Sequence, residues 1–398
     1  MADKQLLYNC ILVLPDVTVP GSILIVDGRI AAVQHGESNA GNNIDAELMD
    51  MEGKFVSPGF VEIHSHGAGG YDFMDNTPEA FTVAAETHLK HGVTTLFPTA
   101  VSADTETLVK FLKTYKIAKI HSSGAKMPGV HLEGPYLNVE QKGAMDPRYI
   151  RNPDKAEYEM LLRVADGDIA RWTVAPELPG ALEFGDVLQS YGILASIGHT
   201  NAEYKDIEAA FRHGFSHFTH FYSCMSTITR RKGFRITGAL ESGYILEDAT
   251  IEIIADGCHL PVELVKYAVR AKGEHRVCLT GDSMRCAGTD VTESFLGPRD
   301  NGIPVVIEDG VAKLIDRSAF AGSIAMADRL LRVAHFDAGI PLHSAVRMMS
   351  LTPAGIMGLD KEIGSIKPGK KADLAVLDGN LAVRGVMLEG KWMSNAFN

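Results

Sequence analysis

Residues 56–352 alternate between short apolar segments and longer segments with helical periodicity, such as PEAFTVAAETHLKHG and DTETLVKFLKTYKIAKIH. The short segments have the length and composition of strands, and they cover residues 60–66, 95–100, 128–133, 171–175, 194–199, 217–221, 250–255 and 277–282. Eight strands separated by helices predict an α/β fold, namely a (β/α)8 TIM-like barrel. Strand counting leaves a doubly wound open sheet as the alternative.

The two ends of the chain have a different pattern. Both contain short strand-like runs separated by turn dipeptides, for example Asp27-Gly28 near the start and Asp378-Gly379 near the end. Neither end is large enough to bury one face of a sheet by itself. We therefore expect residues 1–55 and 353–398 to form one small β-sandwich domain, with the barrel over 56–352.

Polar residues that bind metals follow the predicted barrel strands. Because the carboxyl ends of barrel strands meet at one face, side chains at those ends should lie close together. His64 and His66 are two residues apart on a strand, so both can point to the same side. The other candidates at strand ends are Glu133, His199, His220 and Asp282.

Imidazole nitrogens and carboxylate oxygens are ordinary ligands of divalent metals. Glu133, His199 and His220 could bind one ion, and His64 and His66 a second, with Glu133 or a water between them. Asp282 would then transfer protons. Taken singly, the histidines could only pack, and Asp282 could only cap a turn. The joint pattern of these six residues at strand ends favours a metal site that holds one or two divalent ions.

The composition excludes several classes of protein. A formal net charge of −12 argues against a nucleic-acid partner, and no apolar run approaches the roughly 20 residues of a membrane helix. The five cysteines are scattered without a CxxC pair, and the N-terminus lacks the pattern of a signal peptide. We expect a cytoplasmic enzyme whose anionic substrate, if it has one, is held by local cations.

The motifs PGFVEIHSHG, GVTTLFPT, VHLEGPYLN, SIGHTNAEY, THFYSCM, IADGCHL and SIKPGKKADLAVLD run nearly from end to end of the chain. In them the sequence resembles the amidohydrolase superfamily and, within it, the N-acetylglucosamine-6-phosphate deacetylases. The resemblance implies metal-dependent hydrolysis of the N-acetyl group of an amino-sugar phosphate, giving acetate and the free amine. It also implies that Glu133, His199 and His220 are the principal metal ligands and that Asp282 is the general acid/base. Zinc is the first candidate for the metal, with iron, manganese and cobalt as alternatives.

The substrate end of the pocket departs from the family pattern. Met145 stands where the family usually has a histidine near the substrate carbonyl, and Ser223-Cys224 replaces an Asn-Ala pair that helps to hold phosphate. His259 is retained, and Arg231 aligns with an arginine that reaches phosphate from a neighbouring subunit, which implies a homodimer. Residues 229–232 could instead be a solvated basic loop, or 226–231 a helix. The departures leave open a deacylase acting on another N-acyl amino sugar, or a related amide, without phosphate. A non-enzymatic assembly protein is the remote alternative.

Overall fold

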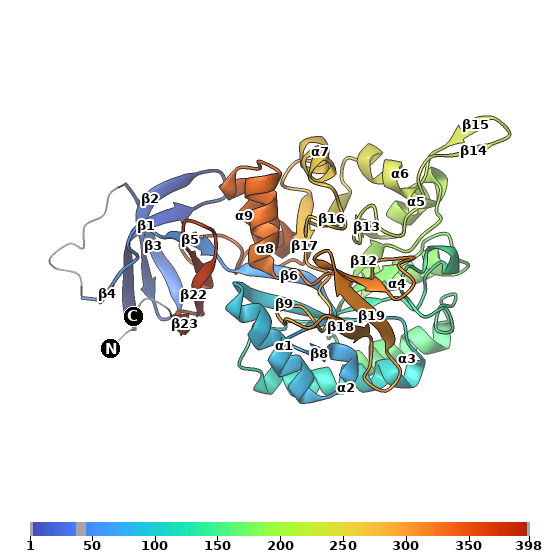
Figure 1. The fold of residues 1–398 in the computed structure, drawn as a ribbon, viewed down its shortest axis with the longest axis horizontal. Helices are drawn as coiled ribbons and strands as arrows, with labels where there is room; N and C mark the ends of the chain where they lie inside the picture. Colours follow the sequence, from blue (N-terminus) through green and yellow to red (C-terminus); the bar gives the residue numbers. More distant parts are fainter. Residues whose placement is uncertain (1–2, 37–44, 396–398) are drawn as a thin grey trace.

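The computed structural model describes residues 3–36 and 45–395 and contains two large sheets (Figure 1). One is a parallel sheet in the order β17-β16-β13-β12-β11-β10-β9-β6. Its strands, in chain order, are β6 (Phe60–Ser65), β9 (Val93–Ala100), β10 (Val130–Glu133), β11 (Ile169–Val174), β12 (Leu194–Ile197), β13 (Phe215–Phe218), β16 (Thr250–Ile254) and β17 (Val277–Thr280). Each of the eight predicted strand segments overlaps one of these strands.

The sheet closes into a barrel where its first and last strands meet. A parallel bridge joins Ser65 to Ser283, and the Asp282 backbone N–H donates to the His64 carbonyl at 3.1 Å. The barrel prediction is therefore confirmed, and the doubly wound open sheet is wrong. Closure also places the end of β17 beside the end of β6. Asp282 therefore lies next to His64, which is in β6, and His66, which directly follows it.

Helices cover the outside of the barrel (Figure 1). Their apolar stripes pack on the strands because buried positions recur with helical spacing, as in the buried Phe81, Ala84, Ala85 and His88 of α1. The α-helices are α1 (Pro78–Lys90), α2 (Thr105–His121), α3 (Lys155–Ala165), α4 (Ala181–Ser190), α5 (Tyr204–Arg212), α6 (Ala239–Ile245), α7 (Val262–Lys272), α8 (Ala327–Arg332), α9 (Leu342–Met349) and α10 (Leu351–Ile356). Short helical turns are η1 (Phe73–Asp75), η2 (Val139–Gln141) and the π-helical η3 (Val333–Asp337).

Strands from both ends of the chain form the second large sheet, which lies beside the barrel (Figure 1). They are β1 (Lys4–Val13), β2 (Thr18–Val26), β3 (Arg29–His35), β4 (Glu47–Asp50), β5 (Phe55–Pro58), β21 (Leu374–Leu377), β22 (Val383–Leu388) and β23 (Lys391–Asn395). The antiparallel pairing of β5 with β21 joins the two ends, as expected. A separate apolar core, which includes Leu7, Leu12, Ile23, Val56 and Val376, lies in this sheet. The boundaries at 55/56 and 352/353 stay a prediction, and the second falls within α10.

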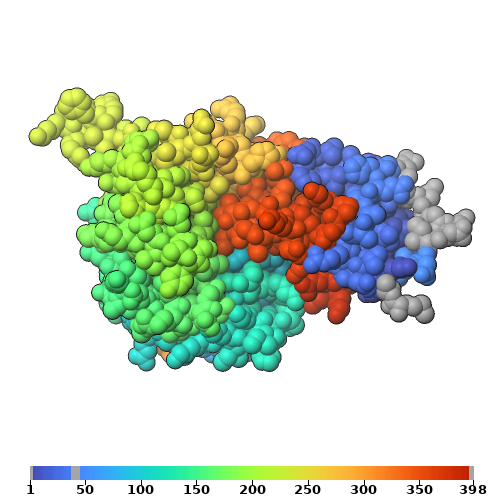
Figure 2. All heavy atoms as spheres, turned by 180° about the vertical axis from the view of Figure 1, so that it is seen from behind, coloured from blue at the N-terminus to red at the C-terminus, as the bar shows by residue number. Residues whose placement is uncertain are grey.

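Three small antiparallel β-structures are inserted in the barrel domain. They are the pair β7 (Gly67–Ala68) and β8 (Tyr71–Asp72), the hairpin β14 (Thr229–Arg231) and β15 (Phe234–Ile236), and the antiparallel meander β18 (Glu293–Leu296), β19 (Ile303–Glu308) and β20 (Val311–Leu314). The hairpin stands out from the body of the molecule in both views (Figures 1 and 2). The helix considered for 226–231 is therefore wrong, because strand pairing of Arg231 with Phe234 forms a hairpin there. No helix in the described parts of the chain is long and apolar enough to cross a membrane.

Candidate metal centre

Glu133, the last residue of β10, lies at the centre of a group of buried polar side chains at the carboxyl ends of the barrel strands. Its two carboxylate oxygens contact different histidines. His64 and His66 lie on the side of Oε2, and His199 and His220 on the side of Oε1. Both sets have three potential ligand atoms within 4.8 Å of one another. The structure thus brings together all five ligands predicted from the sequence.

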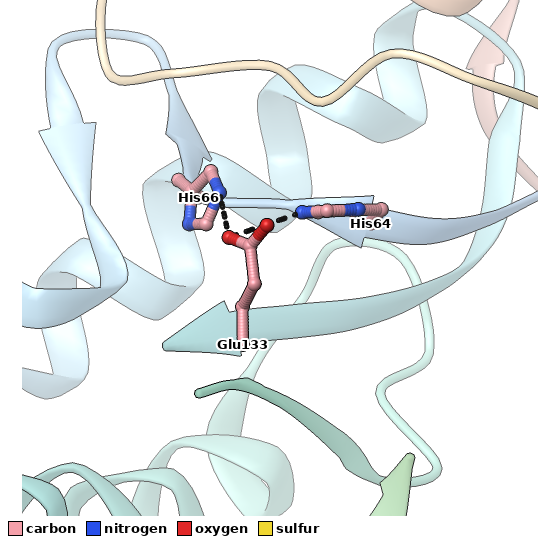
Figure 3. Close-up of side chains that lie close together, drawn as sticks. All are labelled: His64, His66 and Glu133. Carbon is pink, nitrogen blue, oxygen red and sulfur yellow. Dashed lines mark ion pairs between the residues drawn. The ribbon is translucent and has the colours of Figure 1, made fainter. Parts of the chain in front are cut away.

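The first set comes from β6 and β10 (Figure 3). His66 Nε2 lies 3.1 Å from Glu133 Oε2, and His64 Nε2 lies 3.5 Å from the same oxygen. The two imidazoles converge on the carboxylate because residues two apart on a strand share a face, and that face here is the barrel interior. We refer to His64, His66 and Glu133 as the HxH set.

The second set needs two further strands. His199 follows β12 and His220 follows β13, and their Nε2 atoms lie 3.0 Å and 2.9 Å from Glu133 Oε1. The two Nε2 atoms are 3.1 Å apart. We refer to Glu133, His199 and His220 as the two-strand set.

Asp282, just after β17, lies beside the HxH set. Its Oδ1 is 3.2 Å from His66 Nε2 and 3.5 Å from His64 Nε2. Burial alone would raise the pKa of Asp282, but the neighbouring His64 and His66 lower it below its ordinary value. The carboxyl group is therefore ionised at neutral pH and can accept a proton.

The backbone at three of these residues has the unusual left-handed conformation. The φ angles are 47° at His199, 28° at His220 and 43° at Asp282. Such angles cost roughly 1–3 kcal/mol for residues other than glycine, and they concentrate at functional sites. Gly198 is needed just before His199, because a Cβ there would lie 2.7 Å from Thr173 Cγ2.

Two hydrogen bonds fix the orientation of one histidine in each set. His64 Nδ1 lies 2.7 Å from Glu252 Oε1, and His199 Nδ1 lies 2.7 Å from the Gln141 carbonyl oxygen. Because both partners only accept, each Nδ1 carries a proton, and Nε2 is the atom that faces Glu133 and would bind a cation placed there. Metal-ligating histidines in proteins are held in this way.

A buried ion pair supports the His64 side. Arg171 Nη1 on β11 donates to Glu252 Oε2 on β16 at 2.6 Å, and both side chains have no exposed surface. Glu252 Oε1 also accepts from the His220 backbone N–H at 2.9 Å. Burial would raise the pKa of Glu252, but Arg171 and His64 hold it well below its usual range. The Glu252 carboxylate thus contacts one residue of each histidine set.

The donor set fits a divalent cation. Glu133 Oε2 and His64 Nε2 are buried and have no hydrogen-bond partner among the described residues. An unsatisfied buried polar atom costs about 1–3 kcal/mol, and a cation between these atoms would satisfy both. Burial would raise the pKa of Glu133, but His64, His199 and His220 lower it well below its ordinary value, so its carboxyl group is charged.

Of the residues predicted to contact the substrate, all but one line the same pocket. Met145, Ser223, Cys224 and His259 line a cavity of about 200 Å³ that also contains His66, Glu133, His199, His220 and Asp282. Arg231 does not line this cavity. It lies on the projecting hairpin, 63% exposed, in an ion pair with Glu203 of its own chain.

Charged residues inside the barrel were not predicted from the sequence. Glu252 and Arg171 were not singled out, nor was Glu62 on β6, whose carboxylate accepts from Thr280 Oγ1 and the Gly281 N–H. Burial raises the pKa of Glu62 to about 7, although these hydrogen bonds act in the opposite direction. The available signal was a charged residue within an apolar strand, as in TIEII, where a buried carboxylate needs a partner.

Comparisons with known proteins agree with this geometry. Residues 55–393 match the Amidohydrolase family. The N-acetylglucosamine-6-phosphate deacetylase of Haemophilus influenzae is 31% identical over 98% of this chain and 100% of its own length. The N-acetylgalactosamine-6-phosphate deacetylase of Escherichia coli O157:H7 is 30% identical over 93% of this chain and 94% of its own.

A solved structure has the same fold over nearly its whole length. It is a variant of the N-acetyl-D-glucosamine-6-phosphate deacetylase of Mycobacterium smegmatis in complex with N-acetyl-D-glucosamine-6-phosphate. It superposes with a TM-score of 0.89 at 30% identity, covering 99% of this chain and 100% of that one. These matches confirm the family expected from the sequence motifs: the chain belongs to the amidohydrolase family.

Proposed function

We propose that the protein hydrolyses the N-acetyl group of N-acetylglucosamine-6-phosphate, giving glucosamine-6-phosphate and acetate. The observation that supports this most directly is the group of four histidines around Glu133, with Asp282 beside them, on the floor of a pocket. This arrangement suits hydrolysis of an amide C–N bond. Relatives that match nearly the whole chain have this activity in their names.

Divalent metals are general to amidohydrolases, and the two ligand sets support one or two ions per chain. We propose zinc, with iron, manganese or cobalt as alternatives, because histidine and carboxylate ligands suit all four. A cation held here would supply Lewis acidity at the scissile carbonyl. His64 and His199, oriented through Nδ1, would bind the cation through Nε2.

Asp282 would move the proton. A water attacks the acyl carbon, Asp282 Oδ1 accepts its proton, and the same proton passes to the nitrogen as the C–N bond breaks. The lowered pKa of Asp282 favours the ionised form that this first transfer requires.

The polar wall of the pocket would hold the sugar. His259 Nδ1 donates to Asp256 Oδ2 at 2.8 Å, which leaves Nε2 free to contact the substrate. Ser223 can donate to an oxygen of the sugar or its phosphate, and Cys224 lies beside it. Arg231 does not line its own chain's pocket and pairs with Glu203, so its predicted role would require a homodimer. We also propose a cytoplasmic location.

A second candidate is the same reaction on a different N-acyl amino sugar or a related amide, with or without phosphate. Met145, Ser223 and Cys224, which depart from the family pattern, all line the pocket. The Escherichia coli relative, named for the galactosamine epimer, is about as similar as the Haemophilus influenzae one. The assembly-protein alternative predicts loss of ligands, whereas all five ligand side chains converge here.

The test is acetate release from N-acetylglucosamine-6-phosphate, its galactosamine epimer and the two unphosphorylated sugars, with metal content measured on the same sample. We expect kcat/KM to be at least about tenfold higher with phosphate, the value of one charge-assisted hydrogen bond. A ratio near one would favour the second candidate. No acetate from any of the four sugars by metal-loaded protein would contradict both.

A further inference from the structure

The catalytic pocket is lined by hydrogen-bonding groups, such as Ser223 and His259, and by apolar side chains, among them Val101, Met145 and Leu296. We refer to Val101, Met145 and Leu296 as the apolar wall. The three apolar side chains are between 7% and 8% exposed. An N-acyl amino sugar has the same division, because its hydroxyl groups need partners when buried and its acyl chain does not. The apolar wall can therefore accept the acyl group, while the hydrogen-bonding groups contact the sugar.

A second, larger cavity lies directly behind this apolar wall. It has a volume of about 580 Å³, and its lining shares Val101, Ala144, Met145 and Leu296 with the catalytic pocket. The residues that line the larger cavity alone include Met74 and Thr107, together with charged side chains such as Asp75, Asp146 and Arg299. The catalytic pocket, at about 200 Å³, is below the roughly 300–1,000 Å³ usual for ligand sites, whereas its neighbour is within that range.

Met145 is the side chain best able to let a substrate pass between them. A methionine is unbranched and has three rotatable side-chain bonds, so it adapts to a neighbouring group at low cost. Met145 follows Gly143, which has a φ angle of 56°, and Ala144, so small residues precede it in the loop. The wall between the cavities is therefore apolar and deformable at one point.

From these observations we propose that the protein removes N-acyl groups longer than acetyl, and that the extra methylene groups pass Met145 into the larger cavity. The proposal rests on the proposed function, because the reaction is unchanged. Water oxygen bonds to the acyl carbon, the C–N bond breaks, and the products are a longer carboxylate and the same amino sugar. What changes is the class of substrate: linear N-acyl amino-sugar phosphates in place of the N-acetyl compound alone.

The test uses glucosamine-6-phosphate carrying N-acetyl, N-propionyl, N-butyryl or N-hexanoyl groups. The full-length, metal-loaded enzyme is assayed by release of the common amine product. We expect kcat/KM for the N-butyryl compound to be at least one tenth of that for the N-acetyl compound. A closed acetyl-sized pocket would reject each added methylene by roughly tenfold or more, so a lower ratio would overturn the inference.

The two proposals fail in different ways. If no amine is released from any member of the series, the proposed function itself is wrong. If the N-acetyl compound is hydrolysed and the N-butyryl compound falls below one tenth, the proposed function stands and the larger cavity takes no acyl chain.

Variants on α2 test where the chain goes. Thr107 lines the larger cavity but not the catalytic pocket, so Thr107→Trp should lower the ratio of butyryl to acetyl kcat/KM by at least about tenfold. Lys110 also lines the larger cavity, one turn further along α2, and its side chain is exposed. Lys110→Trp therefore provides the same test with less effect on folding. Lys113→Trp, also exposed on α2 but lining neither cavity, is the matched control and should leave the ratio unchanged. An unchanged ratio in both cavity variants would overturn the assignment.

Discussion

His64 and His66 reach Glu133 from a single strand, whereas His199 and His220 reach it from two. In the HxH set, the two-residue repeat of β6 is enough to aim both imidazoles at one carboxylate oxygen. In the two-strand set, each histidine follows its strand in the left-handed conformation, and a third backbone of this kind occurs at Asp282. The histidine pair of the first set is thus a product of local geometry, and that of the second depends on the order of β10 to β13 in the sheet.

The two sets also differ in their neighbours. Asp282 lies near His64 and His66, so the HxH set has a second carboxylate within reach. His64 is held by the charged Glu252, which is itself paired with Arg171, whereas His199 is held by a neutral main-chain carbonyl. Because Glu133 belongs to both sets, we expect its loss to impair metal binding by both.

Glu133→Gln is expected to have the largest effect. The amide keeps the size of the side chain but removes the negative charge that both sets share. We expect loss of bound metal from both sets and a fall in kcat/KM of at least about 1,000-fold, or roughly 4 kcal/mol of barrier. Metal analysis and acetate release measure the two effects, with thermal unfolding as the control for folding. A variant that keeps a full metal complement would show that the two sets bind metal without the shared carboxylate.

Asp282→Asn should leave the metal content nearly unchanged while lowering kcat by about 100- to 10,000-fold, the range for a lost general acid/base. The reason is that Asp282 is placed beside the HxH set, but neither three-residue ligand group requires it. If the variant instead loses one ion and keeps much of its rate with the remaining ion, Asp282 is a ligand of the HxH set. In that outcome Asp282 would be a metal ligand that only the HxH set has, and the proposed proton transfer by Asp282 would be wrong.

The sequence predicted the parts of this site that follow from local periodicity. The order of the eight strands and the polar residues at their ends follow from runs of apolar residues and from the rule that strand ends meet. The Arg171–Glu252 pair does not, because β11 and β16 are not neighbours in the sheet and their side chains meet only across the barrel interior. The larger cavity beside Met145 was likewise not predictable, since residues from α2, β18 and several loops enclose it.

His220→Asn and His66→Asn form a matched pair that tests the two sets directly. Without His66, the HxH set still has His64, Glu133 and the nearby Asp282, whereas without His220 the other set has only Glu133 and His199. We expect the Kd for zinc to rise more in His220→Asn, beyond the roughly 10- to 100-fold typical of a lost outer partner. Titration of metal-free protein with zinc gives both values. Equal losses would mean that Asp282 does not take the place of the missing His66 in the first set.

Glu252→Gln should have the smallest effect on activity, because it changes a support and not a ligand. The glutamine oxygen can still accept from His64 Nδ1, but Arg171 loses its buried counter-ion. We expect metal affinity to fall by about 10- to 100-fold and the free energy of unfolding by about 3–5 kcal/mol. The double variant Glu252→Gln, Arg171→Met removes the unpaired charge and should recover much of the stability. If metal affinity recovers with it, Glu252 acts only through folding. If affinity stays low, the carboxylate positions His64, and the charged support is a real difference between the two histidine sets.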